Sequence, residues 1–397
     1  MLMSTNEMFR VPKMALYWLV VLVGELLIRV IISPLFRLCV AVENLEKNNH
    51  QSYVLYNLTD PSNTTMAKVA QPRPQTTRVL LWAPPRSLST AFERCISALG
   101  DRVQVCHELY TAACHLGPEN QIKIPVLESV VRDPHYTYAW VQKIMEARAP
   151  PKKEIFFCKE LAYSVEGKFD KLPAGYRHTF LIRHPARVFL SMNTLVKRYF
   201  ARTFLDLKLS QVLPKGLVYK EMFDLFEHVT NDLGQEPIII DADDLLQDPL
   251  GVLCAYCNAV GIPFSPSMNK WRPIKEEKRT WIYSTRLMII NKIIGQYDRA
   301  FRTAGLERHV EKPIDLSRVT PEVLEATKAS IGYYEKMYAL RLKTRTPNPY
   351  VHVKPSPNPA VPNGVPSMSN GSPPQTNNQC VSVPFTKVAL YTVANVI

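Results

Sequence analysis

Short apolar runs alternate with longer helical patterns through the middle of this chain, and this alternation limits the fold more than any other feature. Alternating strands and helices are typical of a parallel sheet that is covered by helices. We therefore predict an α/β fold with three α/β/α layers and a central, mainly parallel sheet of about five strands. The predicted strands are residues 79–82, 103–106, 155–158, 179–182 and 238–240.

Polar or charged residues follow each of these predicted strands. The carboxyl ends of parallel strands meet at one edge of the sheet, and open α/β sheets bind their ligands beside that edge. The residues that follow the strands are therefore candidates for a functional site. They are Arg86, His107, Glu108, Lys159, Glu160, Arg183, His184, Asp241, Asp243 and Asp244.

The first of these junctions has the pattern of a phosphate-binding loop. Residues 78–94 read RVLLWAPPRSLSTAFER, which predicts a strand, a tight turn and the start of a helix. Unpaired N–H groups and the helix dipole favour an anion at a helix N-terminus. Arg86 adds a positive charge, while Ser89 and Thr90 supply hydroxyl donors and candidate helix caps. The alternative is a capped strand-to-helix turn without a ligand.

This loop differs from the loop of ordinary ATPases. The ATPase pattern is GxxxxGKS or GxxxxGKT, in which the glycines and the lysine surround the phosphates of the nucleotide. Residues 84–90, PPRSLST, contain neither the glycines nor the lysine. A nucleotide kinase is therefore a less favoured function for this chain.

A second anion-binding pattern follows the fourth predicted strand. Residues 178–200 read HTFLIRHPARVFLSMNTLVKRYF. Arg183 ends the strand, Pro185 begins a helix, and Ser191 lies two turns along that helix, close enough to share one anion with Arg183. The alternatives are a surface ion pair for Arg183 and an ordinary helix hydroxyl for Ser191.

Several segments together resemble one family. PRSLST at 85–90 is followed by HELYTAACHLGPE at 107–119, CKELAYSV at 158–165 and FLIRHPARVFLSM at 180–192. Over residues 76–300 the chain resembles a sulfotransferase-like branch of the P-loop proteins, whose members are often labelled branched-chain aminotransferase-like. An aminotransferase requires pyridoxal phosphate on a lysine within another fold, and no lysine here is marked for that role.

The resemblance implies the donor and the residues that bind it. The donor of this family is 3′-phosphoadenosine 5′-phosphosulfate (PAPS), and no metal is required. Arg86 and the following Ser87, Leu88, Ser89 and Thr90 would hold its 5′ end. Arg183 and Ser191 would hold its 3′ phosphate. The basic segment KEEKRTW at 275–281 either closes over the nucleotide or forms a solvated helix face.

The catalytic base is expected just after the second predicted strand. Glu108 and His107 both stand there, and alternation along a strand turns only one of them toward an acceptor. Glu108 is favoured, because several related sulfotransferases have a carboxylate there, and Arg86 would assist catalysis. Lys159 would stabilise the leaving phosphate or pair with Glu160. The expected activity is sulfuryl transfer to an unidentified hydroxyl or amine acceptor, with a carbohydrate or a small molecule as candidates.

Leu88 departs from the family pattern, which usually has glycine at this position. Glycine allows a positive φ angle and a close approach of phosphate, whereas leucine allows neither freely. We expect either an ordinary helical turn at Leu88 or weakened donor binding. The second outcome would make the chain a catalytically inactive nucleotide-binding protein.

Net charge and cysteine content indicate which ligands and partners the chain can bind. The net charge of +13 suits an anionic ligand, but the basic residues are scattered among acidic ones, so no nucleic acid is expected as a partner. Cys254 and Cys257 form a CxxC without a second ligand pair, and the surrounding helical pattern predicts core packing. We expect no metal site.

The two ends of the chain differ from its middle. Residues 1–45 contain an apolar run at 14–32 that is long enough for a signal anchor, and 46–77 is a polar stem with sequons at Asn57 and Asn63. We predict a single-pass membrane glycoprotein in the type II orientation, located in the Golgi lumen. The alternatives are a cytoplasmic protein and an apolar helix that packs on the domain. Residues 78–343 form the predicted catalytic domain, and 344–397 a disordered tail rich in Pro, Asn and Ser.

Overall fold

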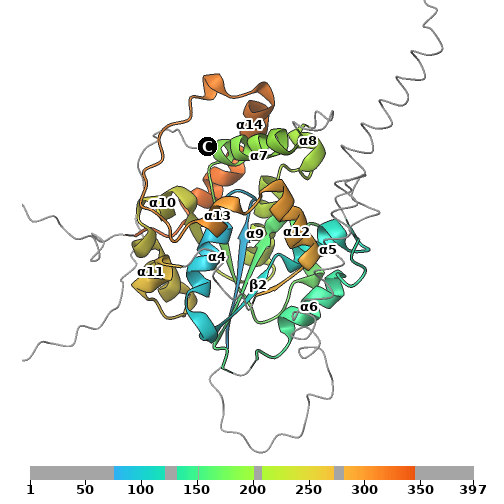
Figure 1. Cartoon of the computed structure of the whole chain (residues 1–397), viewed down its shortest axis with the longest axis vertical. Helices are drawn as coiled ribbons and strands as arrows, with labels where there is room; N and C mark the ends of the chain where they lie inside the picture. Colours follow the sequence, from blue (N-terminus) through green and yellow to red (C-terminus); the bar gives the residue numbers. More distant parts are fainter. Residues whose placement is uncertain (1–75, 121–131, 151, 201–207, 272–280, 345–397) are drawn as a thin grey trace, which may run out of the picture.

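The computed structural model describes residues 76–120, 132–150, 152–200, 208–271 and 281–344 (Figure 1). All five predicted strands are present within these ranges, and a sixth, two-residue strand follows them. The prediction missed this strand because a two-residue pairing has no periodicity of its own. The strands are β1 (Thr77–Ala83), β2 (Val103–His107), β3 (Ile155–Leu161), β4 (Arg177–Ile182), β5 (Ile238–Asp241) and β6 (Ile282–Tyr283).

The six strands form one sheet in the order β5-β4-β1-β3-β2-β6, and every pairing in it is parallel. The chain runs from β1 to β2 on one side of the sheet, and from β4 to β5 on the other. The direction of winding therefore reverses between β1 and β4, which lie next to each other. Ligands of open α/β sheets bind at such a point, outside the carboxyl ends of the strands.

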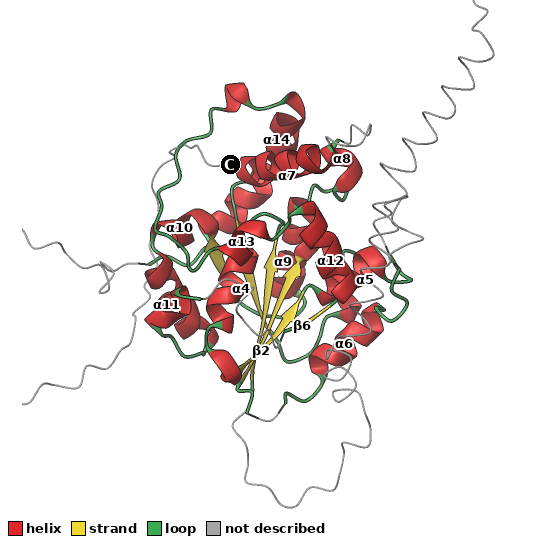
Figure 2. Cartoon of the chain, viewed as in Figure 1, coloured by secondary structure: helices red, strands yellow, loops and turns green. Residues whose placement is uncertain are grey.

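Helices cover both faces of the sheet, as predicted, because the buried side chains of the strands alternate between two cores. Leu80 and Trp82 of β1 pack with α5, α6, α7, α9, α12 and α14. Val79 and Leu81 pack with α4, α10 and α11 on the opposite face. Figure 2 shows α10 and α11 on one side of the yellow strands, and α5 and α6 on the other.

Local sequence signals mark the start of some helices. The Asp248 carboxylate accepts a hydrogen bond from Gly251 N at 3.1 Å and caps α11, which Pro249 starts. Cys254 and Cys257 are buried on that helix. The helices are α4 (Ser89–Ser97), α5 (Leu109–Leu116), α6 (Tyr138–Glu146), α7 (Pro185–Phe200), α8 (Leu209–Val212), α9 (Tyr219–Asn231), α10 (Ala242–Gln247), α11 (Pro249–Val260), α12 (Thr285–Ile294), α13 (Asp298–Arg302) and α14 (Pro321–Ala339).

Several predictions for the chain ends lie outside the described residues. These are the apolar run at 14–32, the sequons at Asn57 and Asn63, and the tail from 345 onward. Within the described ranges, no helix combines the length and the apolar character that crossing a membrane requires.

Candidate functional site

The loop between β1 and α4 has an unusual backbone. Arg86 and Leu88 both adopt left-handed conformations, with φ angles of 62° and 69°. Of the two outcomes expected at Leu88, the helical turn is therefore wrong, because leucine takes the conformation that glycine adopts at no steric cost, and weakened donor binding stays a prediction. A left-handed conformation costs a residue with a side chain on the order of 1–2 kcal/mol. Such strain is maintained only where the surrounding structure enforces it, and it gathers at ligand-binding sites.

The N-terminus of α4 faces this loop without a cap. Leu88 is the N-cap residue and has no side-chain capping hydrogen bond, so the predicted capping by Ser89 and Thr90 is wrong. These two residues instead begin the helix. The Leu88 carbonyl accepts the first helical hydrogen bond, from Phe92 N at 3.0 Å. The N–H groups of the first turn thus have no partner within the helix, which is the arrangement that binds anions.

Groups from three other parts of the chain surround the loop. Arg86 Nε donates to Ser191 Oγ of α7 at 2.9 Å, and Arg86 Nη1 donates to the Gln296 carbonyl at 2.5 Å. Arg183 Nη1, after β4, donates to the Arg86 carbonyl at 2.8 Å. The structure therefore brings Arg86, Arg183 and Ser191 together. It differs from the expectation in one contact, because Ser191 is bound to Arg86 rather than placed beside Arg183 for a common anion.

Positive charge accumulates around Arg86. Burial lowers the pKa of Arg86, and the charges of Arg183, Arg198 and Arg299 lower it further, while Asp298 acts in the opposite sense. Cations that lie this close together repel one another unless an anion comes between them. The loop is therefore an electropositive site at the sheet edge.

Arg183 also belongs to an ion-pair network. The alternative expectation was a surface ion pair, whereas the side chains of Arg183 and Glu311 are only 12% and 8% exposed. Arg183 Nη2 and Arg187 Nη1 bind the two carboxylate oxygens of Glu311 at 3.0 and 2.8 Å. Arg187 Nε binds Asp243 at 3.1 Å. Glu311 thus supplies negative charge to the same arginine that the sequence analysis assigned to the 3′ phosphate.

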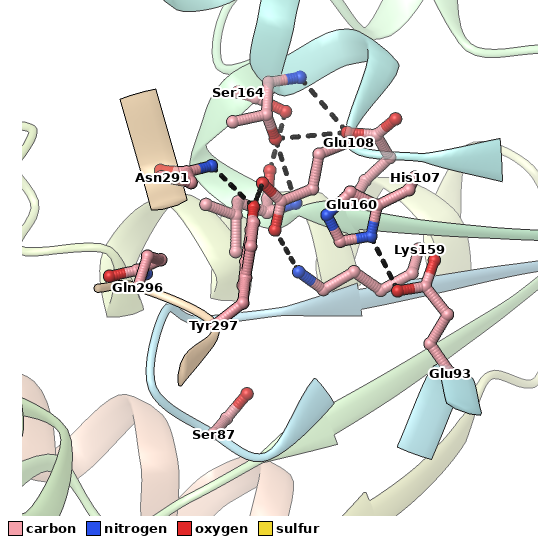
Figure 3. A network of polar contacts seen from close by, with 12 residues as sticks. Ser87, Glu93, His107, Glu108, Lys159, Glu160, Ser164, Asn291, Gln296 and Tyr297 are labelled. Atoms are coloured by element: carbon pink, nitrogen blue, oxygen red, sulfur yellow. Dashed lines mark hydrogen bonds and ion pairs between the residues drawn. The ribbon is translucent and has the colours of Figure 1, made fainter. Parts of the chain in front are cut away.

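A buried polar cluster lies at the ends of β2 and β3 (Figure 3), consisting of Glu93, His107, Glu108, Lys159, Glu160 and Tyr297. Glu108 binds Lys159 Nζ through one carboxylate oxygen and accepts a hydrogen bond from the Tyr297 hydroxyl through the other. Burial alone would raise the pKa of Glu108, but the charges of Lys159 and His107 and these contacts outweigh it and hold the pKa below its ordinary value.

His107 faces a different partner, as expected for neighbours at a strand end. Its Nδ1 lies 2.6 Å from Glu93 Oε2 of α4, and both side chains are buried. The ring packs edge-on against Tyr297, with centroids 5.0 Å apart. Glu108 and His107 are thus held by separate sets of contacts.

Glu160 caps α5 and does not pair with Lys159, so the prediction of that pair is wrong. Its carboxylate accepts hydrogen bonds from Tyr110 N at 3.0 Å and from Thr111 N and Oγ1 at 3.1 Å each. Burial raises the pKa of Glu160 to about 8 against the effect of these donors. Lys159 pairs with Glu108 instead, because Lys159 and Glu160 point to opposite faces of β3.

Four residues of the site were missed by the sequence analysis: Glu93, Gln296, Tyr297 and Glu311. Glu93 had a signal, since it is a charged residue among the buried positions of α4. The others lie 120 or more positions from their partners in the chain, and no local pattern reveals such contacts. Gln296 and Tyr297 are adjacent, so together they connect Arg86 of the loop with Glu108 of the buried polar cluster.

Two further expectations concern a closing segment and a metal. Of the basic segment 275–281, only Trp281 is described, and its Nε1 donates to Ser97 Oγ at 2.9 Å. In the part of the chain that the structure describes, no cluster of three or more His, Cys, Asp or Glu side chains has the arrangement of a metal site.

Comparisons with known proteins agree with the resemblance seen in the sequence. No family model matches the chain. Branched-chain-amino-acid aminotransferase-like proteins 2 and 1 of Arabidopsis thaliana are 29% and 27% identical to it over 217 and 207 residues. These matches cover 51% and 49% of this chain but 34% and 32% of the relatives, so the matched segment spans about a third of their length.

Solved structures of sulfotransferases are also similar to the chain. The sulfotransferase domain of the curacin biosynthetic pathway is 14% identical, with a TM-score of 0.32, and the match covers 64% of this chain and 97% of that domain. A mouse sulfotransferase in complex with PAP is 15% identical, with a TM-score of 0.30 and coverages of 49% and 61%. A sulfotransferase from Alicyclobacillus acidocaldarius is 12% identical, with a TM-score of 0.32 and coverages of 57% and 96%.

Proposed function

We propose that this protein transfers a sulfuryl group from PAPS to a hydroxyl or amine acceptor. One observation carries the proposal: the uncapped N-terminus of α4 lies beside Arg86, Arg183 and Ser191 at the point where the winding of the sheet reverses. Phosphate and sulfate oxygens accept hydrogen bonds from such N–H, guanidinium and hydroxyl groups.

Two separate phosphate-binding groups of residues favour PAPS, which carries a 5′ phosphosulfate and a 3′ phosphate, over ATP, which carries a single phosphate chain. Sulfuryl transfer is an in-line displacement in which charge spreads over peripheral oxygens, so positioning and electrostatic stabilisation supply most of the catalysis. Arg86 and the first turn of α4 would bind the 5′ phosphosulfate. Arg183 and Ser191 would bind the 3′ phosphate, after Ser191 exchanges its hydrogen bond with Arg86 for one to the nucleotide.

The contacts of the buried polar cluster favour His107 over Glu108 as the base that takes the acceptor's proton. Both carboxylate oxygens of Glu108 are engaged, and its pKa is lowered, which makes it a weaker base. His107 keeps its Nε2 without a hydrogen-bond partner among the described residues. Glu108 would then hold Lys159 in place beside the leaving phosphate.

Glu311 supports a second candidate function, nucleotide binding without transfer. Its carboxylate occupies both Arg183 and Arg187, and this competes with a 3′ phosphate for the same guanidinium groups. A chain that retains this ion pair would hold PAP weakly and position the donor poorly. The two candidates share the fold and the loop, so only binding and transfer measurements separate them.

Titration calorimetry with adenosine 3′,5′-bisphosphate (PAP) and with ATP tests the proposal first. We expect PAP to bind at least about ten-fold more tightly than ATP, a difference of about 1.4 kcal/mol. Transfer of labelled sulfate from PAPS to a panel of hydroxyl and amine acceptors tests catalysis. Absence of PAP binding contradicts both candidate functions, and PAP binding without transfer to any acceptor supports the second one.

Replacing Glu311 by glutamine is expected to raise the affinity for PAP by about ten-fold, or about 1.4 kcal/mol. The amide no longer holds Arg183 by charge, and one negative charge is removed from the neighbourhood of the phosphate. Calorimetry measures the change, with the exposed Glu227→Gln on α9 as the matched control. An affinity equal to or below that of the unmodified protein would show that Arg183 does not contact the nucleotide.

A further inference from the structure

Glu93 and His107 form a buried pair, of which only His107 has a role in the proposed reaction. The distance from His107 Nδ1 to Glu93 Oε2 is 2.6 Å. Glu93 lies on α4 and His107 ends β2, and the side chains are 0% and 2% exposed. A carboxylate so completely removed from water is costly unless it interacts with a specific partner.

Within the part of the chain that the structure describes, each side chain of the pair uses only one of its two polar atoms in a hydrogen bond. Among the described residues, Glu93 Oε1 and His107 Nε2 are buried and have no hydrogen-bond partner. Leaving such an atom unpaired costs free energy, so a pair that only stabilised the core would be expected to have hydrogen-bond partners for both atoms. Buried polar atoms without a partner need another explanation. One explanation is that they belong to a reacting group and bind an atom of the ligand.

The contact with Glu93 determines which nitrogen of His107 carries the proton. When Glu93 is ionised, its carboxylate only accepts hydrogen bonds, so Nδ1 of His107 donates, and in the neutral ring Nε2 keeps its lone pair. The other titratable or charged groups around the ring are Glu108 beside it, Lys159 opposite it on β3, and Tyr297. Figure 3 shows the second ring nitrogen on the side away from Glu93, toward Tyr297 and Glu108.

Burial raises the pKa of Glu93, and the neighbouring His107 opposes this rise. The attraction between the two side chains is therefore largest when His107 carries a positive charge. An interaction that becomes stronger as charge develops accelerates a reaction, whereas one that is equally strong throughout does not.

The helix that carries Glu93 also forms the anion site. Glu93 lies four residues after Ser89, about one helical turn or 6 Å along α4. The N–H groups that face the loop and the carboxylate that contacts His107 are therefore parts of one rigid element. PAPS bound at the start of α4 would therefore keep a fixed position relative to a histidine that the second turn of α4 orients.

We propose that Glu93 is a positioning residue, which holds His107 in the tautomer with a proton on Nδ1 so that Nε2 removes the proton of the acceptor. This inference rests on the proposed function. In the step, the acceptor's oxygen or nitrogen forms a bond to sulfur while its proton passes to Nε2. The bond from sulfur to the bridging oxygen breaks, and its electron pair leaves on the 5′ phosphate of PAP. Glu93 then stabilises the imidazolium.

The variant Glu93→Gln tests this role, because it keeps the shape of the side chain and removes the charge. We expect kcat for sulfuryl transfer to fall at least about 100-fold, a smaller effect than the roughly 10⁴-fold loss seen when the carboxylate partner of a serine protease's catalytic histidine becomes an amide. KM for PAPS and the affinity for PAP should stay within about two-fold, since Glu93 does not contact the nucleotide.

The ¹⁵N NMR shifts of His107 give a readout that does not depend on activity. In the unmodified protein Nδ1 should show the shift of a protonated nitrogen and Nε2 that of a nitrogen with a lone pair, and Glu93→Gln should abolish this preference. His107→Gln assigns the signals, and Glu227→Gln is the matched control. An unchanged tautomer or an unchanged kcat in Glu93→Gln would overturn the inference. Failure of the proposed function would instead show as absence of PAP binding and transfer in the unmodified protein.

Discussion

The variant Arg86→Ala is expected to bind PAP about 100-fold more weakly than the unmodified protein, which corresponds to one charge-assisted hydrogen bond of about 3 kcal/mol. We also expect kcat for sulfuryl transfer to fall by about another 100-fold. Removing one hydrogen-bond donor that stabilises negative charge in the transition state has an effect of about this size. Arg86 is the cation of the loop itself, and its guanidinium lies between α7 and the residues before α13.

Two control variants separate the charge of Arg86 from its geometry. Arg86→Lys keeps the charge but cannot reach Ser191 and the Gln296 carbonyl together, so it should recover affinity more than kcat. Arg102→Ala removes an arginine from an exposed ion pair with Glu154 and should leave both quantities unchanged. If Arg86→Ala bound PAP as the unmodified protein does, the loop would not be the nucleotide site.

The variant Lys159→Met is expected to lower the free energy of unfolding by about 3–5 kcal/mol, because it leaves Glu108 as a buried carboxylate without its cation. Tyr297 remains as a hydrogen-bond donor to Glu108 but does not neutralise the charge. The corresponding fall in Tm is about 10 °C for a domain of this size. Chemical and thermal denaturation at pH 7 measure both quantities.

The double variant Lys159→Met with Glu108→Gln should regain most of this loss, since the unpaired charge is then gone. The pH dependence has a definite sign. Because the pKa of Glu108 is lowered from 4.5 in the folded protein, its contribution to stability is present above pH 4.5 and is lost as the pH falls through the folded pKa. In Lys159→Met the same carboxyl lacks its cation and takes up a proton at a higher pH than in the unmodified protein, so the difference between the two proteins should shrink as the pH falls. A difference that stayed constant with pH would show that Lys159 acts through packing alone.

The fold could be predicted from the sequence because its signals are local. Each buried strand is a short apolar run, so residues 79–82 or 238–240 identify a strand without any knowledge of the rest of the chain. Strand β6 could not be predicted, because two residues join the sheet only through their pairing with Cys106 and His107 of β2.

The backbone at Leu88 is a case in which local reasoning gave the wrong answer. Leucine disfavours a positive φ angle, so the sequence favours a helical turn at this position. In the folded protein Leu88 is left-handed, and its side chain packs against the core on the α4 face of the sheet. Tertiary contacts therefore impose a conformation that the residue by itself avoids, and the loop keeps the form that exposes the N–H groups of α4.

Local patterns are enough to predict which residues gather at the sheet edge, because every parallel strand delivers its following residue to the same side. Arg86, His107, Glu108 and Arg183 were all found in this way. The contacts among them depend on the tertiary structure. Ser191 meets Arg86, Lys159 meets Glu108, and His107 meets Glu93. These pairings depend on how helices and strands pack across long separations in the chain, and that information is absent from any local pattern.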